Sequence, residues 1–126
     1  MKLLLDTHIL LWSLAENPRL KPRIRDLITD RNNEVLFSTV SIWEVLIKIR
    51  VGKMQLDWRR LGPAALSAGF AKIGIEHDHL VALAALPRHH GDPFDHMLVA
   101  QASAEGATLV TTDRILGDYP VRVIPA

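Results

Sequence analysis

The chain has 126 residues, 48% of them hydrophobic, which predicts one globular domain over residues 1–126 with its own core. Fifteen Lys and Arg against fourteen Asp and Glu give a formal net charge of +1, far from the basic balance of a dedicated nucleic-acid binder. The absence of cysteine excludes disulfides and thiolate chemistry, and without a bilayer-length apolar run or a signal-peptide pattern we expect a soluble, cytoplasmic protein.

The first segment, Lys2–Leu5, is apolar without polar alternation, which predicts a strand covered on both faces in a parallel sheet. Asp6 follows directly, at the carboxyl end of the strand, where open α/β sheets bind ligands. An isolated Asp at such a turn more often only caps the next helix, predicted here over residues 7–14. Whether Asp6 is a site residue therefore depends on other acids reaching the same edge.

A second helix is predicted to begin at Pro22, because apolar residues follow it at helical spacing. Val35–Ser38 is again short and apolar throughout, which predicts a second strand parallel to the first.

The next helix is predicted over residues 40–51 and ends at Gly52. Its apolar residues share one stripe: Val40, Trp43, Ile47 and Val51. Glu44 lies near the helix start, and Ser41 with Glu44 also matches a capping box, while Lys48 has the spacing of a surface ion-pair partner. The alternative is that Glu44 reaches the same sheet edge as Asp6.

The middle of the chain is less regular. Residues 58–68 predict a helix with a break at Gly62-Pro63, residues 71–75 a weak strand, and residues 78–86 a helix stopped by Pro87. The histidine pairs His77/His79 and His89/His90 lack a set of four ligands for zinc, so we expect solvated loop histidines.

The last third carries two more acids. A helix is predicted over residues 96–105 and ends at Gly106; Pro93 suits its first turn, which places Asp95 where a helix N-terminus stabilises negative charge. Asp92 is interpreted as the cap of this helix rather than a fifth site acid. Thr108–Thr111 predicts a strand that delivers Thr112 and Asp113, and residues 121–124 can close the sheet.

Four acids are thus predicted at one rim of a parallel sheet: Asp6, Glu44, Asp95 and Asp113. Carboxylates a few ångströms apart raise one another's pKa, so the cluster calls for a neutralising cation. Mg²⁺ or Mn²⁺ suits this all-oxygen set and can activate water and stabilise a phosphodiester leaving group. We therefore interpret the four acids as a metal-dependent catalytic site.

Several stretches of this chain resemble the PIN domain family, and within it the VapC-type toxins of toxin–antitoxin pairs. They are Leu-Leu-Leu-Asp6-Thr7-His8, Ser41-Ile-Trp-Glu44-Val45 with Lys48, His90-Gly-Asp-Pro-Phe-Asp95-His-Met-Leu-Val-Ala-Gln-Ala, and Thr108-Leu-Val-Thr-Thr-Asp113. They occur in the family's order and span nearly the whole chain.

The resemblance implies a three-layer α/β/α fold with a mostly parallel sheet of four to five strands. It also implies Mg²⁺-dependent endoribonuclease activity, with Mn²⁺ able to substitute, homodimers, and inhibition by a cognate VapB-like antitoxin. By the family's motifs, Asp6 and Asp95 are the main metal ligands, and Glu44 and Asp113 bind metal directly or through water. Thr112 corresponds to a residue that holds a metal-bound water or a phosphate.

Some positions near the motifs are candidates for contact with substrate phosphate: Thr7, His8, Arg88 and His96. Close relatives usually have Arg where this chain has His96, which would weaken a phosphate contact above the pKa of the histidine. The three tryptophans are predicted to lie in the core or an interface rather than to stack on bases: Trp12, Trp43 and Trp58.

Other function classes fit less well. A haloacid-dehalogenase phosphatase needs an acid two residues after Asp6, where this chain has His8. A receiver domain needs an acceptor Asp at the end of a central strand and a Lys at a later strand end, and Phe37-Ser38 and Val110-Thr111 supply neither. The absence of a glycine-rich phosphate loop argues against a nucleotide cofactor. A catalytically silent PIN-fold module, acting only through RNA or protein partners, stays open as the alternative to a ribonuclease.

Overall fold

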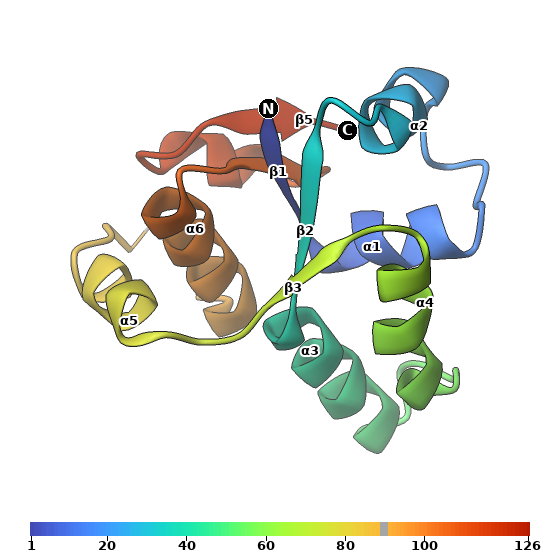
Figure 1. Ribbon diagram of the computed structural model, residues 1–126. Helices are drawn as coiled ribbons and strands as arrows, with labels where there is room; N and C mark the ends of the chain where they lie inside the picture. The colour runs from blue at the N-terminus through green and yellow to red at the C-terminus, as the bar shows by residue number, and fades with distance from the viewer. Residues whose placement is uncertain (89–90) are drawn as a thin grey trace.

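The computed structural model describes residues 1–88 and 91–126, and its centre is a parallel sheet in the order β3-β2-β1-β4-β5. The strands are β1 (Lys2–Leu5), β2 (Glu34–Ser38), β3 (Ala71–Ile73), β4 (Thr108–Thr111) and β5 (Val123–Pro125). The chain starts in the middle of the sheet, adds β2 and β3 on one side, and then crosses to add β4 and β5 on the other (Figure 1). The direction of winding therefore changes between β1 and β4, which leaves a crevice at their carboxyl ends.

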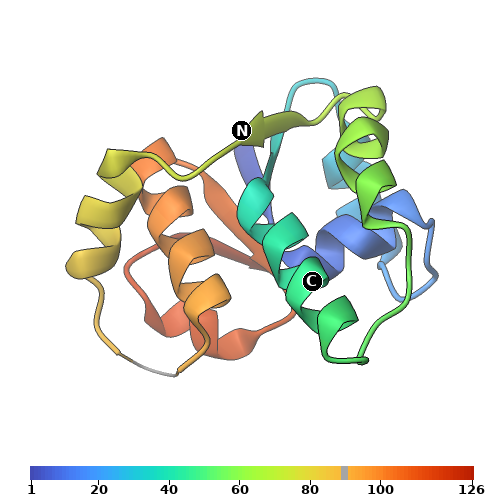
Figure 2. The same ribbon diagram turned by 90° about the horizontal axis from the view of Figure 1, so that it is seen from below.

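Helices cover both faces of the sheet. They are α1 (Thr7–Leu14), α2 (Pro22–Thr29), α3 (Thr39–Arg50), α4 (Leu61–Ser67), α5 (His77–Ala84) and α6 (Pro93–Glu105), with 3₁₀ turns η1 (Trp58–Arg60) and η2 (Arg114–Asp118). Helices α1, α2 and α4 lie on one side and α5 and α6 on the other, with α3 between α1 and α6 (Figures 1 and 2). This arrangement confirms the predicted three-layer α/β/α fold.

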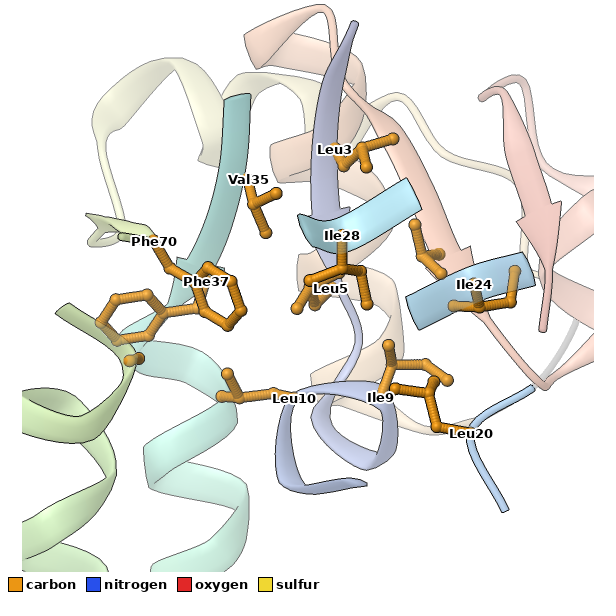
Figure 3. Close-up of a cluster of buried hydrophobic side chains, with 12 residues drawn as sticks. Leu3, Leu5, Ile9, Leu10, Leu20, Ile24, Ile28, Val35, Phe37 and Phe70 are labelled. Atoms are coloured by element: carbon orange, nitrogen blue, oxygen red, sulfur yellow. The ribbon is translucent and has the colours of Figure 1, made fainter. Parts of the chain in front are cut away.

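Successive side chains of the apolar strands point into two different hydrophobic cores, one on each face of the sheet. Leu3 and Leu5 pack with Val35 and Phe37 against α1, α2 and α4 (Figure 3), whereas Leu4 packs on the opposite face with α6. All three leucines of β1 are fully buried, because successive side chains of a strand point to opposite faces and both faces are covered. The buried central strand thereby fixes where the chain emerges at Asp6.

Several element boundaries differ from those predicted. Helix α6 begins at Pro93 rather than at residue 96, because the Asp92 carboxylate accepts from two backbone N–H groups and starts the helix there. Helix α4 begins at Leu61, so Gly62-Pro63 lies in its first turn, after η1 rather than inside a broken helix. The last strand is shifted to residues 123–125.

Burial of two predicted features is decided by the structure. On the apolar stripe of α3, Val40 is buried but Trp43 is 50% exposed, Ile47 37% and Val51 61%, since the buried residues of this helix all lie between Val40 and Val45. His79 was expected to be a solvated loop histidine, but it is buried in α5, where its Nδ1 accepts from the backbone N–H of Glu76. His89 and His90 lie outside the described residues.

In residues 1–88 and 91–126, no helix combines the length and the apolar character that crossing a bilayer requires.

Candidate active site

A pocket of about 280 Å³ opens at the carboxyl edge of the sheet, beside the change in winding direction. We call it the acidic pocket; its lining residues are Asp6, Thr7, His8, Glu44, Lys48, Asp92, Asp95, Thr112 and Asp113. A larger hollow of about 450 Å³ beside α2 contains a single acid, Asp30, and lacks such a cluster. The four acids singled out in the sequence thus come together in one place, although they are up to 107 positions apart.

Asp6 is both a helix cap and a pocket residue. Its Oδ1 accepts a hydrogen bond of 2.9 Å from the backbone N–H of Ile9, and its Oδ2 accepts from the hydroxyl of Thr111. Burial raises the pKa of Asp6 above its ordinary value, and these two hydrogen bonds lower it only in part. The capping role weighed in the sequence therefore exists, but it does not exclude a place in the site.

Glu44 sits in the second turn of α3, so the predicted capping box with Ser41 is wrong. The helix starts at Thr39, and the hydroxyl of Ser38 accepts from the backbone N–H of Val40. Glu44 instead points into the pocket, where its Oε1 accepts from the Thr7 hydroxyl at 2.7 Å and its Oε2 lies 2.9 Å from Lys48 Nζ. Thr7, expected to contact substrate, is buried and positions Glu44 in this structure.

The first turn of α6 brings Asp92 and Asp95 to the pocket. Asp92 accepts from the backbone N–H groups of Phe94 at 2.9 Å and Asp95 at 3.2 Å, as its predicted capping role requires. It also lines the pocket, which the sequence interpretation did not include.

The loop after β4 supplies Thr112 and Asp113. The hydroxyl of Thr111 accepts from the backbone N–H of Asp113 at 3.0 Å and donates to Asp6, so it links the ends of β4 and β1. This buried threonine was missed in the sequence, where nothing marks a hydrogen bond to a residue 105 positions away. Lys48 was also missed as a pocket residue, although its spacing from Glu44 had suggested an ion pair.

Two candidate substrate contacts are not among the pocket-lining residues. Arg88 is exposed, and the ring of His96 lies 5.8 Å from that of Tyr119, away from the pocket lining. His8, by contrast, lines the pocket and is exposed, and its charge favours the ionised form of Asp6.

Among the acids of the pocket, Asp95 has a strongly raised pKa. Burial, followed by the nearby charges of Asp92, Glu44, Asp6 and Asp113 in that order, raises the pKa of this carboxyl to about 7. Both its burial and the neighbouring acids therefore favour the protonated form of Asp95 when no cation is bound.

The donor chemistry of the acidic pocket fits a hard divalent cation, because carboxylate and hydroxyl oxygens dominate its lining. Within the described part of the chain, no three His, Asp or Glu side chains form a ready-made metal cage. A cation would have to draw the carboxylates toward itself and release the proton of Asp95.

Comparisons with known proteins give one family match and several solved structures with a similar fold. The PIN domain family model matches residues 3–121. Among solved structures, VapBC2 from Rickettsia felis bound to a promoter DNA fragment has a chain that is 19% identical, with a TM-score of 0.77 and coverage of 99% of this chain and 98% of that one. DNA-bound VapBC from Salmonella typhimurium is 17% identical, with a TM-score of 0.68 and coverage of 99% and 98%. VapBC-5 from Mycobacterium tuberculosis is 19% identical, with a TM-score of 0.62 and the same coverage. A comparison with curated protein sequences gives no match.

The raised pKa of Asp95 predicts how stability depends on pH when no cation is bound. Its carboxyl keeps a proton in the folded state up to about pH 7, while the unfolded chain loses it near the ordinary value of 3.8. Stability in EDTA should therefore fall as pH rises from 4 to 7. Because Asp95 is only partly buried, we expect Asp95→Asn to stabilise the protein at pH 8 by about 1 kcal/mol, or 3–6 °C in Tm.

Thermal unfolding in EDTA at pH 5 and pH 8 measures this effect, with Asp78→Asn, at an exposed position of α5, as control. The variant should lose part of the pH dependence rather than all of it, because Asp6 is shifted in the same direction. If the change in Tm between pH 5 and pH 8 were the same in Asp95→Asn and in the unchanged protein, Asp95 would be ionised in the folded state at both pH values.

Proposed function

Because the chain belongs to the PIN domain family, we propose that it is a metal-dependent endoribonuclease that acts as the toxin of a toxin–antitoxin pair. The observation that carries the proposal is the convergence of Asp6, Glu44, Asp95 and Asp113 in the acidic pocket. Apolar strands and helix caps alone would not require four acids at one edge, where Asp6, Glu44 and Asp113 all raise the pKa of Asp95.

In this proposal, Asp6 and Asp95 would hold a Mg²⁺ ion, for which Mn²⁺ could substitute, and Glu44 and Asp113 would bind it directly or through water. When bound, such an ion would supply positive charge beside the phosphodiester and Lewis-acid chemistry for its hydrolysis. The protein's part is to keep the carboxylates in place.

Neutral donors hold the acids of the pocket in position. The Thr111 hydroxyl and the backbone N–H of Ile9 fix both oxygens of Asp6, while Thr7 fixes one oxygen of Glu44. These neutral donors leave the negative charge of Asp6 available to a cation, whereas the other oxygen of Glu44 is paired with Lys48. Thr112, at the exposed rim, is suited to hold a water or a substrate phosphate.

Loss of either main ligand should abolish Mg²⁺-dependent cleavage of RNA. We expect Asp6→Asn and Asp95→Asn to reduce the cleavage rate by more than about 100-fold, beyond the cost of losing an outer-shell partner. Asn at position 6 can still cap α1, so the variant tests the charge rather than the helix start. Cleavage of total RNA in Mg²⁺ and in EDTA, with mapped product ends, is the measurement.

Asp78→Asn serves as the matched control, since Asp78 is exposed and lies outside the acidic pocket. If the folded double variant cleaves RNA as fast as the unchanged protein, the mechanism is wrong. If the unchanged protein binds RNA but never cleaves it, the alternative of a catalytically silent binding module is favoured.

A cognate VapB-like antitoxin is the proposed protein partner. Support comes from the solved VapBC complexes, whose chains share this fold along almost their whole length. The product of a small neighbouring reading frame should co-purify with this chain and relieve its toxicity on co-expression. Asp6→Asn should be harmless when expressed alone and yet still bind that product, which separates binding from catalysis. Failure of every neighbouring product to bind would contradict the partner proposal.

We also propose a homodimer, and the exposed stripe of α3 supports it. Trp43, Ile47 and Val51 follow one another at four-residue spacing and are all exposed, and a continuous exposed apolar stripe of this kind is typical of an interaction surface. Ile47→Glu is expected to halve the mass measured by light scattering. Leu66→Glu, at an exposed apolar position of α4, is the control and should leave the mass unchanged. A monomer in both the unchanged protein and the control would argue against the dimer.

A further inference from the structure

Lys48 is the sole Lys or Arg among the described residues that line the acidic pocket. It lies one turn after Glu44 on α3, and its Nζ is 2.9 Å from Glu44 Oε2. The Lys48 side chain is 31% exposed, whereas that of Glu44 is only 7% exposed. The ammonium group is therefore paired with a buried carboxylate, while the lysine side chain that carries it is partly exposed at the pocket.

The position of Glu44 does not depend on Lys48 alone. The Thr7 hydroxyl donates to the other oxygen of Glu44 at 2.7 Å, and it lies 3.0 Å from Ser41 Oγ. An i,i+4 Glu–Lys pair on a helix contributes only about 0.3–0.5 kcal/mol. A purely structural role would thus be a small one, and it would not explain why the cation is directed into the pocket.

The acidic pocket poses a problem for a polyanionic substrate. Asp6, Glu44, Asp92, Asp95 and Asp113 all line it, and their charges repel phosphate as well as one another. One divalent cation cannot cancel five carboxylates, so an RNA strand needs a further positive group at the point of contact. Lys48 is placed to supply it.

We propose that Lys48 is a substrate-binding residue, whose ammonium group contacts a phosphate oxygen of the RNA strand while it remains bonded to Glu44. The inference rests on the proposed ribonuclease function and goes beyond it, since it adds a positively charged phosphate contact to the four acids and Thr112. A lysine ammonium has three N–H donors, and Glu44 is the one partner recorded for it among the described residues. A lysine that lines the pocket and uses one donor for Glu44 therefore has donors left for a further acceptor.

The test compares three variants in RNA binding. Lys48→Gln keeps a donor for Glu44 but loses the charge, Lys48→Arg keeps both, and Lys21→Gln removes an exposed lysine at the N-cap of α2, outside the acidic pocket. Fluorescence anisotropy with a labelled single-stranded RNA, in Ca²⁺ at several salt concentrations, gives the affinity and its salt dependence. Each phosphate contact with a single strand adds about 0.7 to the slope of log K against log salt.

We expect Lys48→Gln to bind RNA about 10-fold more weakly and to lower the magnitude of that slope by about 0.7. Lys48→Arg should restore both values, and Lys21→Gln should match the unchanged protein. In Mg²⁺, Lys48→Gln should raise KM more than it lowers kcat. Thermal unfolding of all three variants measures any structural contribution separately.

If Lys48→Gln lowers Tm but keeps the original slope and KM, Lys48 is only a structural partner of Glu44 and the inference is overturned. If the unchanged protein cleaves RNA and Lys48→Gln cleaves and binds it equally well, the inference fails while the ribonuclease function stands. If the unchanged protein neither binds nor cleaves RNA, the proposed function fails, and this inference fails with it. If Lys48→Gln does not fold, the slope of log K against log salt for RNA binding is measured on Lys48→Met instead, and it decides between the same outcomes.

Discussion

Repulsion between carboxylates at the carboxyl edge of the sheet is the constraint on which this structure depends. Asp95 shows its strength, because burial and four neighbouring acids raise the pKa of Asp95 to about 7. Hydrogen bonds to the acids offset this repulsion. The donors are backbone N–H groups at the starts of α1 and α6 and the hydroxyls of Thr7 and Thr111. The hydrogen bonds by which Asp6 and Asp92 cap their helices thus also hold these acids in the pocket. A capping role therefore does not exclude a role in the site.

The order of the strands decides where these acids meet. Winding outward from β1 in two directions places β4 beside β1, so Asp6 and the loop with Asp113 end next to each other. The hydroxyl of Thr111 joins the two strand ends, since it donates to Asp6 and accepts from the backbone N–H of Asp113. A sheet with the same strands in another order would scatter the same acids along its edge.

Helix α3 connects the site to the outer surface. Glu44 and Lys48 of this helix line the acidic pocket. Trp43, Ile47 and Val51 of the same helix are exposed at the surface of the protein. Phe94, next to Asp95 in α6, packs against Trp43 in a T-shaped arrangement with ring centroids 4.8 Å apart. A partner that covers this stripe would consequently contact the two helices that supply Glu44 and Asp95.

The amino-acid sequence by itself determined the elements and the candidate acids. The all-apolar runs predicted β1, β2 and β4, and an acid after each of two strands marked Asp6 and Asp113, because burial on both faces and strand-end position are local properties. Tertiary structure alone decided that Glu44 belongs to the pocket rather than to a capping box, that the stripe of α3 is exposed, and that His79 is buried. It also placed Lys48 at the pocket and joined Thr111 to Asp6. Those outcomes depend on which neighbour each side chain meets across the sheet, and hydrogen bonds between residues as far apart as Asp6 and Thr111 leave no periodic pattern in the chain.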